Sequence, residues 1–127
     1  MKFKGFFDGS SKPNPGIMTI GGVIKDKSNT VIIKYSEELD YGTNNQSEYL
    51  SLKRLLDEAI KADIKSIEIF GDSALVVNQV NGKWKVKDSK LLILCNQVRY
   101  KLKHYFTEWK LEHVKRGFNK EADLLTR

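Results

Sequence analysis

The sequence has a single cysteine, two prolines and no long apolar run, and these shortages exclude several classes of protein. One cysteine rules out an internal disulfide, and because Cys95 lies in an apolar stretch we expect a reduced core residue. No segment approaches the roughly 18 apolar residues that span a bilayer. Charged residues also come too early in the chain for a signal peptide. We therefore expect a cytoplasmic protein with no membrane partner.

Composition and charge bound the remaining choices. Hydrophobic residues make up 40% and charged residues 30% of the 127 residues, as in ordinary globular proteins. No repeat, low-complexity tract or Pro/Ser-rich linker divides the chain, so we expect one domain over 1–127, and nothing demands more than a monomer without an obligate protein partner. The net charge of +6 and pI of about 9.4 favour a polyanionic partner. A merely soluble basic protein fits the charge equally well.

The first forty residues alternate between β-branched runs and turn residues. This pattern predicts strands over 3–8, 18–25 and 30–37, with a break at Gly9 and a hairpin loop at 26–29. Three strands that follow one another in this way indicate antiparallel pairing.

From Asn45 the apolar period becomes helical, and Asn45 with Glu48 matches a capping-box pattern. The later elements are predicted as strand 66–70, helix 73–80, basic loop 83–87, a helix that ends near 104, strand 109–114 and a short helix from 120. The long helix is predicted to turn five side chains inward: Leu91, Leu92, Leu94, Val98 and Leu102. The order of elements predicts an α/β fold, a mixed sheet with helices on both faces.

Four acidic residues stand at the predicted element boundaries. Asp8 and Asp72 close apolar runs, whereas Glu48 and Asp123 lie at helix starts. Each has an ordinary structural interpretation as a turn, capping-box or first-turn residue. Carboxylates at strand ends are also suited to hold a hard divalent cation through oxygen. Four of them on a basic chain favour metal-assisted chemistry on a phosphodiester.

Four motifs together resemble the ribonuclease H family, type 1, over nearly the whole chain. They are Asp8-Gly9-Ser10 with Asn14-Pro15-Gly16, Thr43 to Glu48, Asp72-Ser73, and Asn119 to Asp123. Each occurs widely alone, and their order and spacing carry the resemblance. It implies a ribonuclease H-like fold with a five-stranded mixed sheet. It also implies endonucleolytic hydrolysis of the RNA strand of RNA–DNA hybrids, leaving 5′-phosphate ends, with two Mg²⁺ (or Mn²⁺) ions held by Asp8, Glu48, Asp72 and Asp123.

The same resemblance implies contacts to the hybrid. Five residues match positions near the 2′-hydroxyls of the RNA strand: Gly9, Ser10, Asn14, Asn44 and Glu48. Thr43 and Asn14 match positions that hold a DNA phosphate. The asparagines fit turn and cap roles as well. Trp84 lies in the basic stretch 83–87, which suits either a duplex-binding surface or a solvated loop with the indole tucked into the core.

The sequence departs from the family pattern in three places. Only residues 83–87 stand where many members carry a basic handle, so we expect weaker or more salt-sensitive binding. The loop 114–119 contains no histidine, and we expect Arg116 or Lys115 to reach the scissile phosphate or a leaving product there. His113 fits a partly buried structural imidazole better than a proton shuttle. Ala74 lacks the longer polar side chain that contacts substrate in some relatives.

Two other functions stay open at this point. A hybrid- or RNA-binding module without catalysis is one alternative, although such modules usually lack part of the carboxylate set. A metal-dependent DNA exonuclease of the same fold is the other. Those enzymes typically carry a glutamate two residues after the first aspartate, and this chain has Ser10 there.

Overall fold

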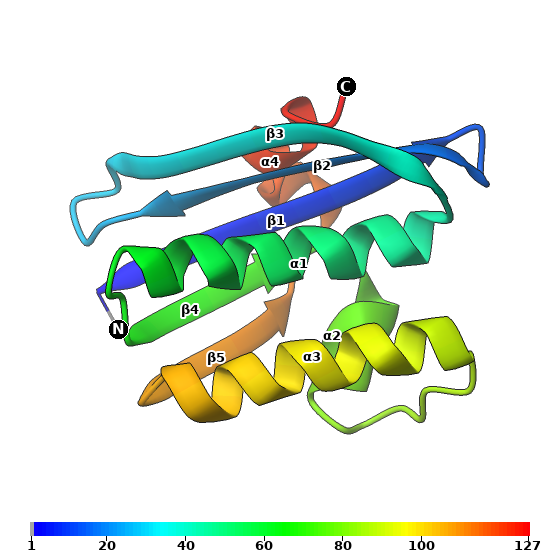
Figure 1. Cartoon of the computed structure of the whole chain (residues 1–127). Coiled ribbons are helices and arrows are strands. Elements are labelled where there is room, and N and C mark those ends of the chain that lie inside the picture. Colours follow the sequence, from blue (N-terminus) through cyan, green and yellow to red (C-terminus); the bar gives the residue numbers. More distant parts are fainter. Residues whose placement is uncertain (1) are drawn as a thin grey trace.

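Five strands form one mixed sheet in the order β3-β2-β1-β4-β5 in the computed structural model, which describes residues 2–127 (Figure 1). The strands are β1 (Phe3–Lys12), β2 (Gly16–Lys25), β3 (Val31–Gly42), β4 (Ser66–Gly71) and β5 (Glu108–His113). β1, β2 and β3 pair antiparallel, whereas β4 is parallel to both β1 and β5. The predicted mixed sheet, with its first three strands antiparallel, is confirmed.

The helices cover both faces of this sheet. They are α1 (Asn44–Lys61), α2 (Ala74–Val80), α3 (Ser89–Tyr105), the 3₁₀ turn η1 (Arg116–Phe118) and α4 (Lys120–Leu124). α1 packs on β1 and β2 and also against α3, while α4 packs on β1 and β2 from behind the sheet (Figure 1). Within residues 2–127 no helix has the length and apolar content needed to cross a bilayer.

The predicted break in β1 at Gly9 is wrong. β1 continues to Lys12 because its pairing with β2 runs on through Gly9↔Ile20. Pairing with β4 ends earlier, at Phe7↔Gly71. Asp8 is therefore in the middle of a strand, yet it is the first β1 residue beyond the end of β4. β1 and β4 are no longer paired beyond that point, and the space between them lets other side chains reach the Asp8 carboxylate.

The predicted start of the first helix is also wrong. Thr43, not Asn45, is the N-cap: its hydroxyl accepts a hydrogen bond from the Gln46 N–H at 3.1 Å, and the Gln46 side chain accepts one from the Thr43 N–H at 2.8 Å. This is a complete capping box. Glu48 is thereby released from a capping role.

The core lies between the sheet and the layer of α1 and α3. It is built from fully buried aromatic and aliphatic side chains, the largest being Tyr49, Phe7, Ile24, Leu52, Leu55 and Leu56. α3 turns Leu91, Cys95, Val98 and Leu102 inward, a spacing of four, three and four residues. Leu92, which was expected inside, is 43% exposed, whereas Cys95 is a buried free thiol as predicted.

Candidate functional site

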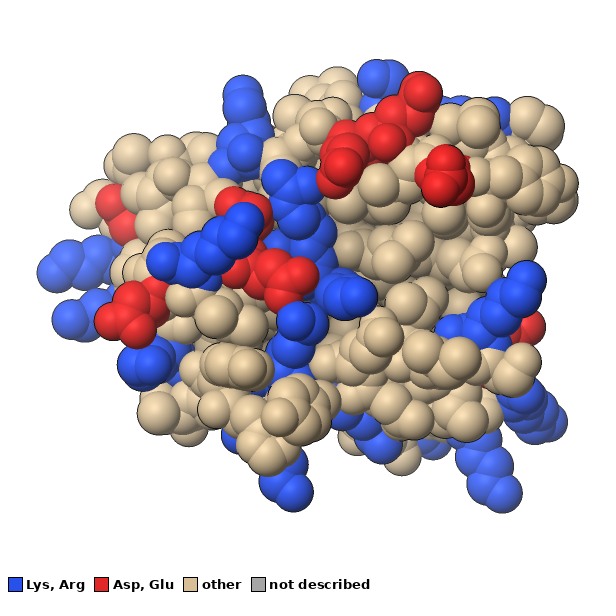
Figure 2. Space-filling view, in the orientation of Figure 1, with Lys and Arg blue, Asp and Glu red and all other residues tan. Residues whose placement is uncertain are grey.

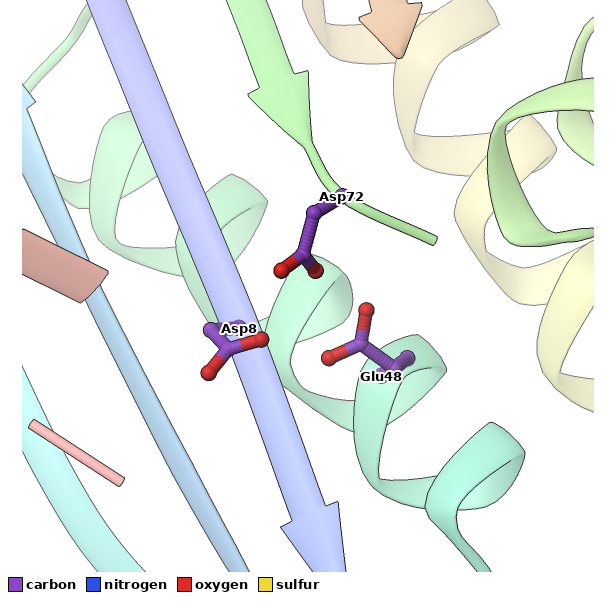
Figure 3. Close-up of side chains that lie close together, drawn as sticks. All are labelled: Asp8, Glu48 and Asp72. Carbon is purple, nitrogen blue, oxygen red and sulfur yellow. The ribbon is translucent and has the colours of Figure 1, made fainter. Parts of the chain in front are cut away.

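Three carboxylates from distant parts of the chain meet where β1 leaves β4. Asp8 comes from β1, Glu48 from the beginning of α1 and Asp72 from the residue after β4. One oxygen of each lies within 4.8 Å of the others, and Figure 3 shows the three groups directed toward a common space. Asp8 and Glu48 are only 3% and 6% exposed. The sequence predicts that four carboxylates converge, and the structure brings three of them together here.

Gly9 allows the helix to approach the strand this closely. A Cβ atom at Gly9 would lie 2.4 Å from the backbone carbonyl of Ser47, well inside van der Waals contact. The Gly9 N–H donates a short hydrogen bond to Glu48 Oε1. Glu48 Oε2 is buried and has no hydrogen-bond partner. A buried carboxylate oxygen without a donor is a costly arrangement unless a cation completes it.

The electrostatics of the cluster follow from burial and crowding. Burial, together with the negative charge of Asp72, raises the pKa of Asp8 to about 6, while the hydrogen bond from Thr126 acts in the opposite direction. Burial, followed by the charges of Asp8 and Asp72, also raises the pKa of Glu48 well above its ordinary value. A bound divalent cation would reverse this preference and favour the ionised forms. The oxygen-only donor set and the unpaired Glu48 oxygen fit a hard cation such as Mg²⁺.

Asp123 stands beside this cluster rather than inside it. It lies on α4, is 8% exposed, and is outside the trio whose oxygens approach within 4.8 Å. Its carboxylate is occupied by Arg127 Nη2 at 2.8 Å. Arg116 connects it to the cluster, with Nη2 3.7 Å from Asp123 and Nε 3.9 Å from Asp72. The chain thus assembles a trio and holds the fourth acid next to it through arginine.

Two grooves lie near these acids. The first, of about 440 Å³, is lined by the trio and by Gly9, Ser10, Lys12, Asn44 and Arg116. The second, of about 640 Å³, is lined by Asn14, Thr43, Asn44 and the beginning of α3. Asn44 lines both grooves, and the acids line only the first.

Asn14 and Asn44 also perform the turn and cap work that the sequence allowed for them. The Asn44 side chain accepts a hydrogen bond from the Ser11 N–H at 2.6 Å, and the Asn14 side chain accepts one from the Asn44 N–H at 3.1 Å. These bonds use only the side-chain oxygen of each asparagine, so each side-chain NH₂ group can still donate hydrogen bonds to another partner. A structural role and a contact with substrate are therefore compatible at both positions.

Other predicted residues lie farther from the acids. Trp84 is 50% exposed, so the interpretation of a core indole is wrong, and it lines neither of these two grooves. His113 is exposed rather than partly buried, with Nε2 3.2 Å from the backbone oxygen of Asp72. Ala74 is the first residue of α2. The basic handle is absent, since only residues 81–88 separate α2 from α3.

Two residues near the acids were missed by sequence reasoning. The Thr126 hydroxyl donates to Asp8 Oδ2 at 3.1 Å, and Arg127 pairs with Asp123. Neither belongs to a motif, and Thr126 is 118 residues from Asp8 in the chain. The residues around them in the sequence do not indicate contacts with Asp8 or Asp123. Those contacts form only when α4 packs on β1 and β2.

Comparison with known proteins places the chain in a family. The family model described as reverse transcriptase-like matches residues 6–127. A ribonuclease HI of Halobacterium salinarum is 34% identical over 120 residues, covering 94% of this chain and 60% of that protein. A bifunctional protein of Mycobacterium tuberculosis is 36% identical over 93% of this chain and 32% of its own length. The chain therefore spans less than two thirds of the length of each of these curated relatives.

Solved structures agree with the sequence relatives. The crystal structure of RNase H1 from Halobacterium salinarum superposes with a TM-score of 0.94 at 33% identity, covering 98% of this chain and 94% of that chain. The crystal structure of LC11-RNase H1 in complex with an RNA/DNA hybrid gives a TM-score of 0.91 at 30% identity, with coverage of 98% and 93%. The similarity thus extends over the sheet, the helices and both ends of the described chain.

Proposed function

The chain belongs to the ribonuclease H family, type 1, and on that premise we propose that residues 1–127 form a catalytic domain that hydrolyses the RNA strand of RNA–DNA hybrids. The observation that carries this proposal is the trio of Asp8, Glu48 and Asp72, of which Asp8 and Glu48 are buried and one Glu48 oxygen has no hydrogen-bond partner. Such a cluster is unfavourable without a cation. The similarity to a relative solved with an RNA/DNA hybrid supports the choice of substrate.

The proposed metal ligands are Asp8, Glu48, Asp72 and Asp123. Two Mg²⁺ or Mn²⁺ ions held by these carboxylates would activate a water and stabilise the leaving 3′-oxygen, and the products would then carry 5′-phosphate ends. Asp8 lies next to both other members of the trio, since one of its oxygens is within 4.8 Å of Glu48 and of Asp72. Arg116 spans Asp72 and Asp123, and its guanidinium is 72% exposed at the side-chain level, free to meet a phosphate.

The two grooves, which share Asn44 as a lining residue, suggest how a hybrid would lie. We assign the RNA strand to the first groove, where Gly9, Ser10 and Asn44 stand beside the acids and face its 2′-hydroxyls. We assign a phosphate of the DNA strand to the second groove, beside Asn14 and Thr43. Trp84 and the lysines of 83–87 are exposed and suit a sugar and phosphates farther along the duplex. The buried free thiol of Cys95 is compatible with a monomer that works in the reducing cytoplasm.

A substrate panel tests this proposal. The protein is incubated with end-labelled RNA–DNA hybrid, duplex RNA and duplex DNA, each with MgCl₂ or with EDTA. We expect Mg²⁺-dependent internal cleavage of the RNA in the hybrid alone, and the Asp72→Asn variant should lose about 10²-fold or more of the rate. Hybrid binding without cleavage would instead identify a binding module, and DNA shortened from its 3′ ends would identify an exonuclease.

Arg116 requires its own comparison because the loop lacks histidine. Arg116→Ala is expected to lower the single-turnover rate of hybrid cleavage, since no other described cation lies between Asp72 and Asp123. His113→Ala is the matched variant, on an exposed side chain beside the same loop. An unchanged rate for Arg116→Ala would remove it from the proposed site.

A further inference from the structure

Thr126 makes an unusual set of contacts for a residue in a turn at the end of a helix. It is 5% exposed, and its hydroxyl lies 3.1 Å from Asp8 Oδ2 and 2.8 Å from the backbone oxygen of Asp123. Outside the carboxylate cluster, no other side chain of residues 2–127 donates a hydrogen bond to Asp8. A single buried hydroxyl therefore touches one proposed metal ligand and the backbone of another.

The turn that carries Thr126 is fixed to three strands. The Ser36 hydroxyl on β3 donates to the Leu125 carbonyl at 2.5 Å, and the Ser10 hydroxyl on β1 donates to the Thr126 carbonyl at 3.4 Å. On β2, a Cβ at Gly21 would lie 2.6 Å from Leu125 Cβ, so the turn rests directly on the backbone of that strand. The position of the Thr126 hydroxyl is thus determined by the sheet.

The two acceptors compete for one hydroxyl proton. The backbone oxygen of Asp123 already receives the Thr126 N–H at 3.1 Å. The Asp8 carboxylate is the stronger acceptor when ionised and has no other donor from outside the cluster. The Thr126 hydroxyl therefore donates its hydrogen bond preferentially to Asp8 Oδ2 rather than to the Asp123 carbonyl. Its role then goes beyond capping the end of α4.

We propose that Thr126 is a positioning residue that holds the Asp8 carboxylate in the orientation needed for metal binding, an inference that rests on the proposed function. Figure 3 shows the two Asp8 oxygens on different sides, one toward Glu48 and Asp72 and the other away from them. A donor that holds one oxygen fixes the rotation of the carboxylate and hence the direction of the other. Groups that orient metal ligands in this way typically change metal affinity by about 10- to 100-fold when removed.

The test measures metal binding directly, without substrate. MnCl₂ is titrated into the full chain by calorimetry for the wild type, Thr126→Val and Thr126→Ser. We expect Thr126→Val to weaken Mn²⁺ binding by about tenfold and Thr126→Ser, which keeps the hydroxyl, to stay close to wild type. Thr107→Val is the matched control because the Thr107 hydroxyl also donates to a backbone oxygen, that of Lys65 at 3.2 Å, at an exposed position far along the sheet.

Activity and folding are followed in the same variants. If the protein cleaves hybrids, Thr126→Val should lower kcat and raise the Mg²⁺ concentration for half-maximal rate while KM for hybrid is unchanged. Should Thr126→Val fail to fold, Thr126→Ala takes its place in the same titration. Wild-type Mn²⁺ affinity in Thr126→Val, equal impairment in Thr126→Ser, or no Mn²⁺ binding by the wild type overturns the inference. Absence of hybrid cleavage alongside intact Mn²⁺ binding would overturn only the proposed function.

Discussion

Glu48 is where stability and the proposed chemistry oppose each other most directly. Its carboxylate is buried beside two other acids, and its pKa is raised by that burial and by their charges. At pH 7.5 without metal, Glu48→Gln should therefore increase the free energy of unfolding by on the order of 1 kcal/mol, because it removes a carboxyl group whose ionisation is opposed by burial and by the neighbouring acids. Urea unfolding in EDTA measures this, and the same variant should lose hybrid cleavage.

The control for that variant is Glu112→Gln, which makes the same change on an exposed β5 position. It should alter neither stability nor cleavage. A Glu48→Gln protein that is less stable than wild type in EDTA would contradict the idea that the cluster is strained without metal. Such a result would favour an ordinary structural role for this side chain.

Gly9 gives a second prediction at the scale of one residue. A methyl group there would meet the backbone of Ser47 at 2.4 Å, and backbone cannot swing away as a side chain can. Gly9→Ala should cost about 1–3 kcal/mol of unfolding free energy, as overpacking does, and should push α1 and Glu48 away from Asp8. Gly117→Ala is the control, since nothing lies within 4 Å of its added Cβ. Equal thermal stability of the two variants would show that the contact between β1 and α1 is looser than described.

At the scale of elements, two capping patterns compete for the start of α1, and variants can distinguish them. Thr43 makes the capping box with Gln46, whereas Asn45 is an exposed residue of the first turn. Thr43→Ala should lower the unfolding free energy by about 1 kcal/mol, and Asn45→Ala should leave it nearly unchanged. Chemical denaturation of both variants decides between them. A larger loss of unfolding free energy for Asn45→Ala than for Thr43→Ala would show that Asn45 is the N-cap, as the sequence suggested.

This ambiguity shows what local sequence determines and what it does not. Two overlapping patterns, Thr43 with Gln46 and Asn45 with Glu48, satisfy the same capping rule, and nothing local chooses between them. The choice depends on Glu48 being needed elsewhere, beside Asp8. The order of strands and helices, by contrast, could be predicted because apolar periodicity and turn residues are local signals.

The end of β1 was predicted wrongly, at Gly9, for a related reason. Glycine weakens a strand locally, but the ladder between β1 and β2 extends across it. The carboxylates of the trio could be predicted because each stands in a recognisable motif. Thr126 and Arg127 could not, because their contacts depend on the docking of a short helix on the far face of the sheet. Leu92 was misplaced since a run of leucines fits more than one helical register, and packing against α1 selects Leu91 and Cys95.

For the whole molecule, the positive charge is distributed rather than concentrated on the helical face. Figure 2 shows Lys and Arg spread over the side that carries α1 and α3, with Asp and Glu among them. Some are paired there, as Arg54 is with Glu37 at 2.7 Å and Lys101 with Asp57 at 2.6 Å. Without a handle, the loop 83–87 offers three exposed lysines, Lys83, Lys85 and Lys87, and none of them forms an ion pair within residues 2–127.

That distribution makes salt dependence informative. If Lys85 contacts one phosphate, Lys85→Ala should weaken hybrid binding and reduce the slope of log K against log[salt] by about 0.9. Lys61→Ala removes the same charge at the far end of α1, where Lys61 is exposed near Glu58, and should leave the slope unchanged. Binding is measured at several NaCl concentrations with CaCl₂ in place of MgCl₂. Identical slopes for both variants would exclude the loop from the interface.

The pH dependence of stability tests the site as a property of the whole molecule. Asp8 in the folded protein holds its proton up to about pH 6, whereas an unfolded aspartate loses it near 3.8. The folded state therefore binds more protons in this window, and the free energy of unfolding attributable to Asp8 falls as pH rises from about 4 to about 7. Comparing the wild type with Asp8→Asn isolates this contribution from that of other carboxylates.

If Mg²⁺ binds the ionised cluster of the folded state, as proposed, it should restore more stability at pH 8 than at pH 5. Thermal unfolding with MgCl₂, against NaCl of equal ionic strength, gives the comparison. Equal stabilisation at both pH values, or an effect retained in Asp8→Asn, would mean that the cation binds elsewhere on the protein.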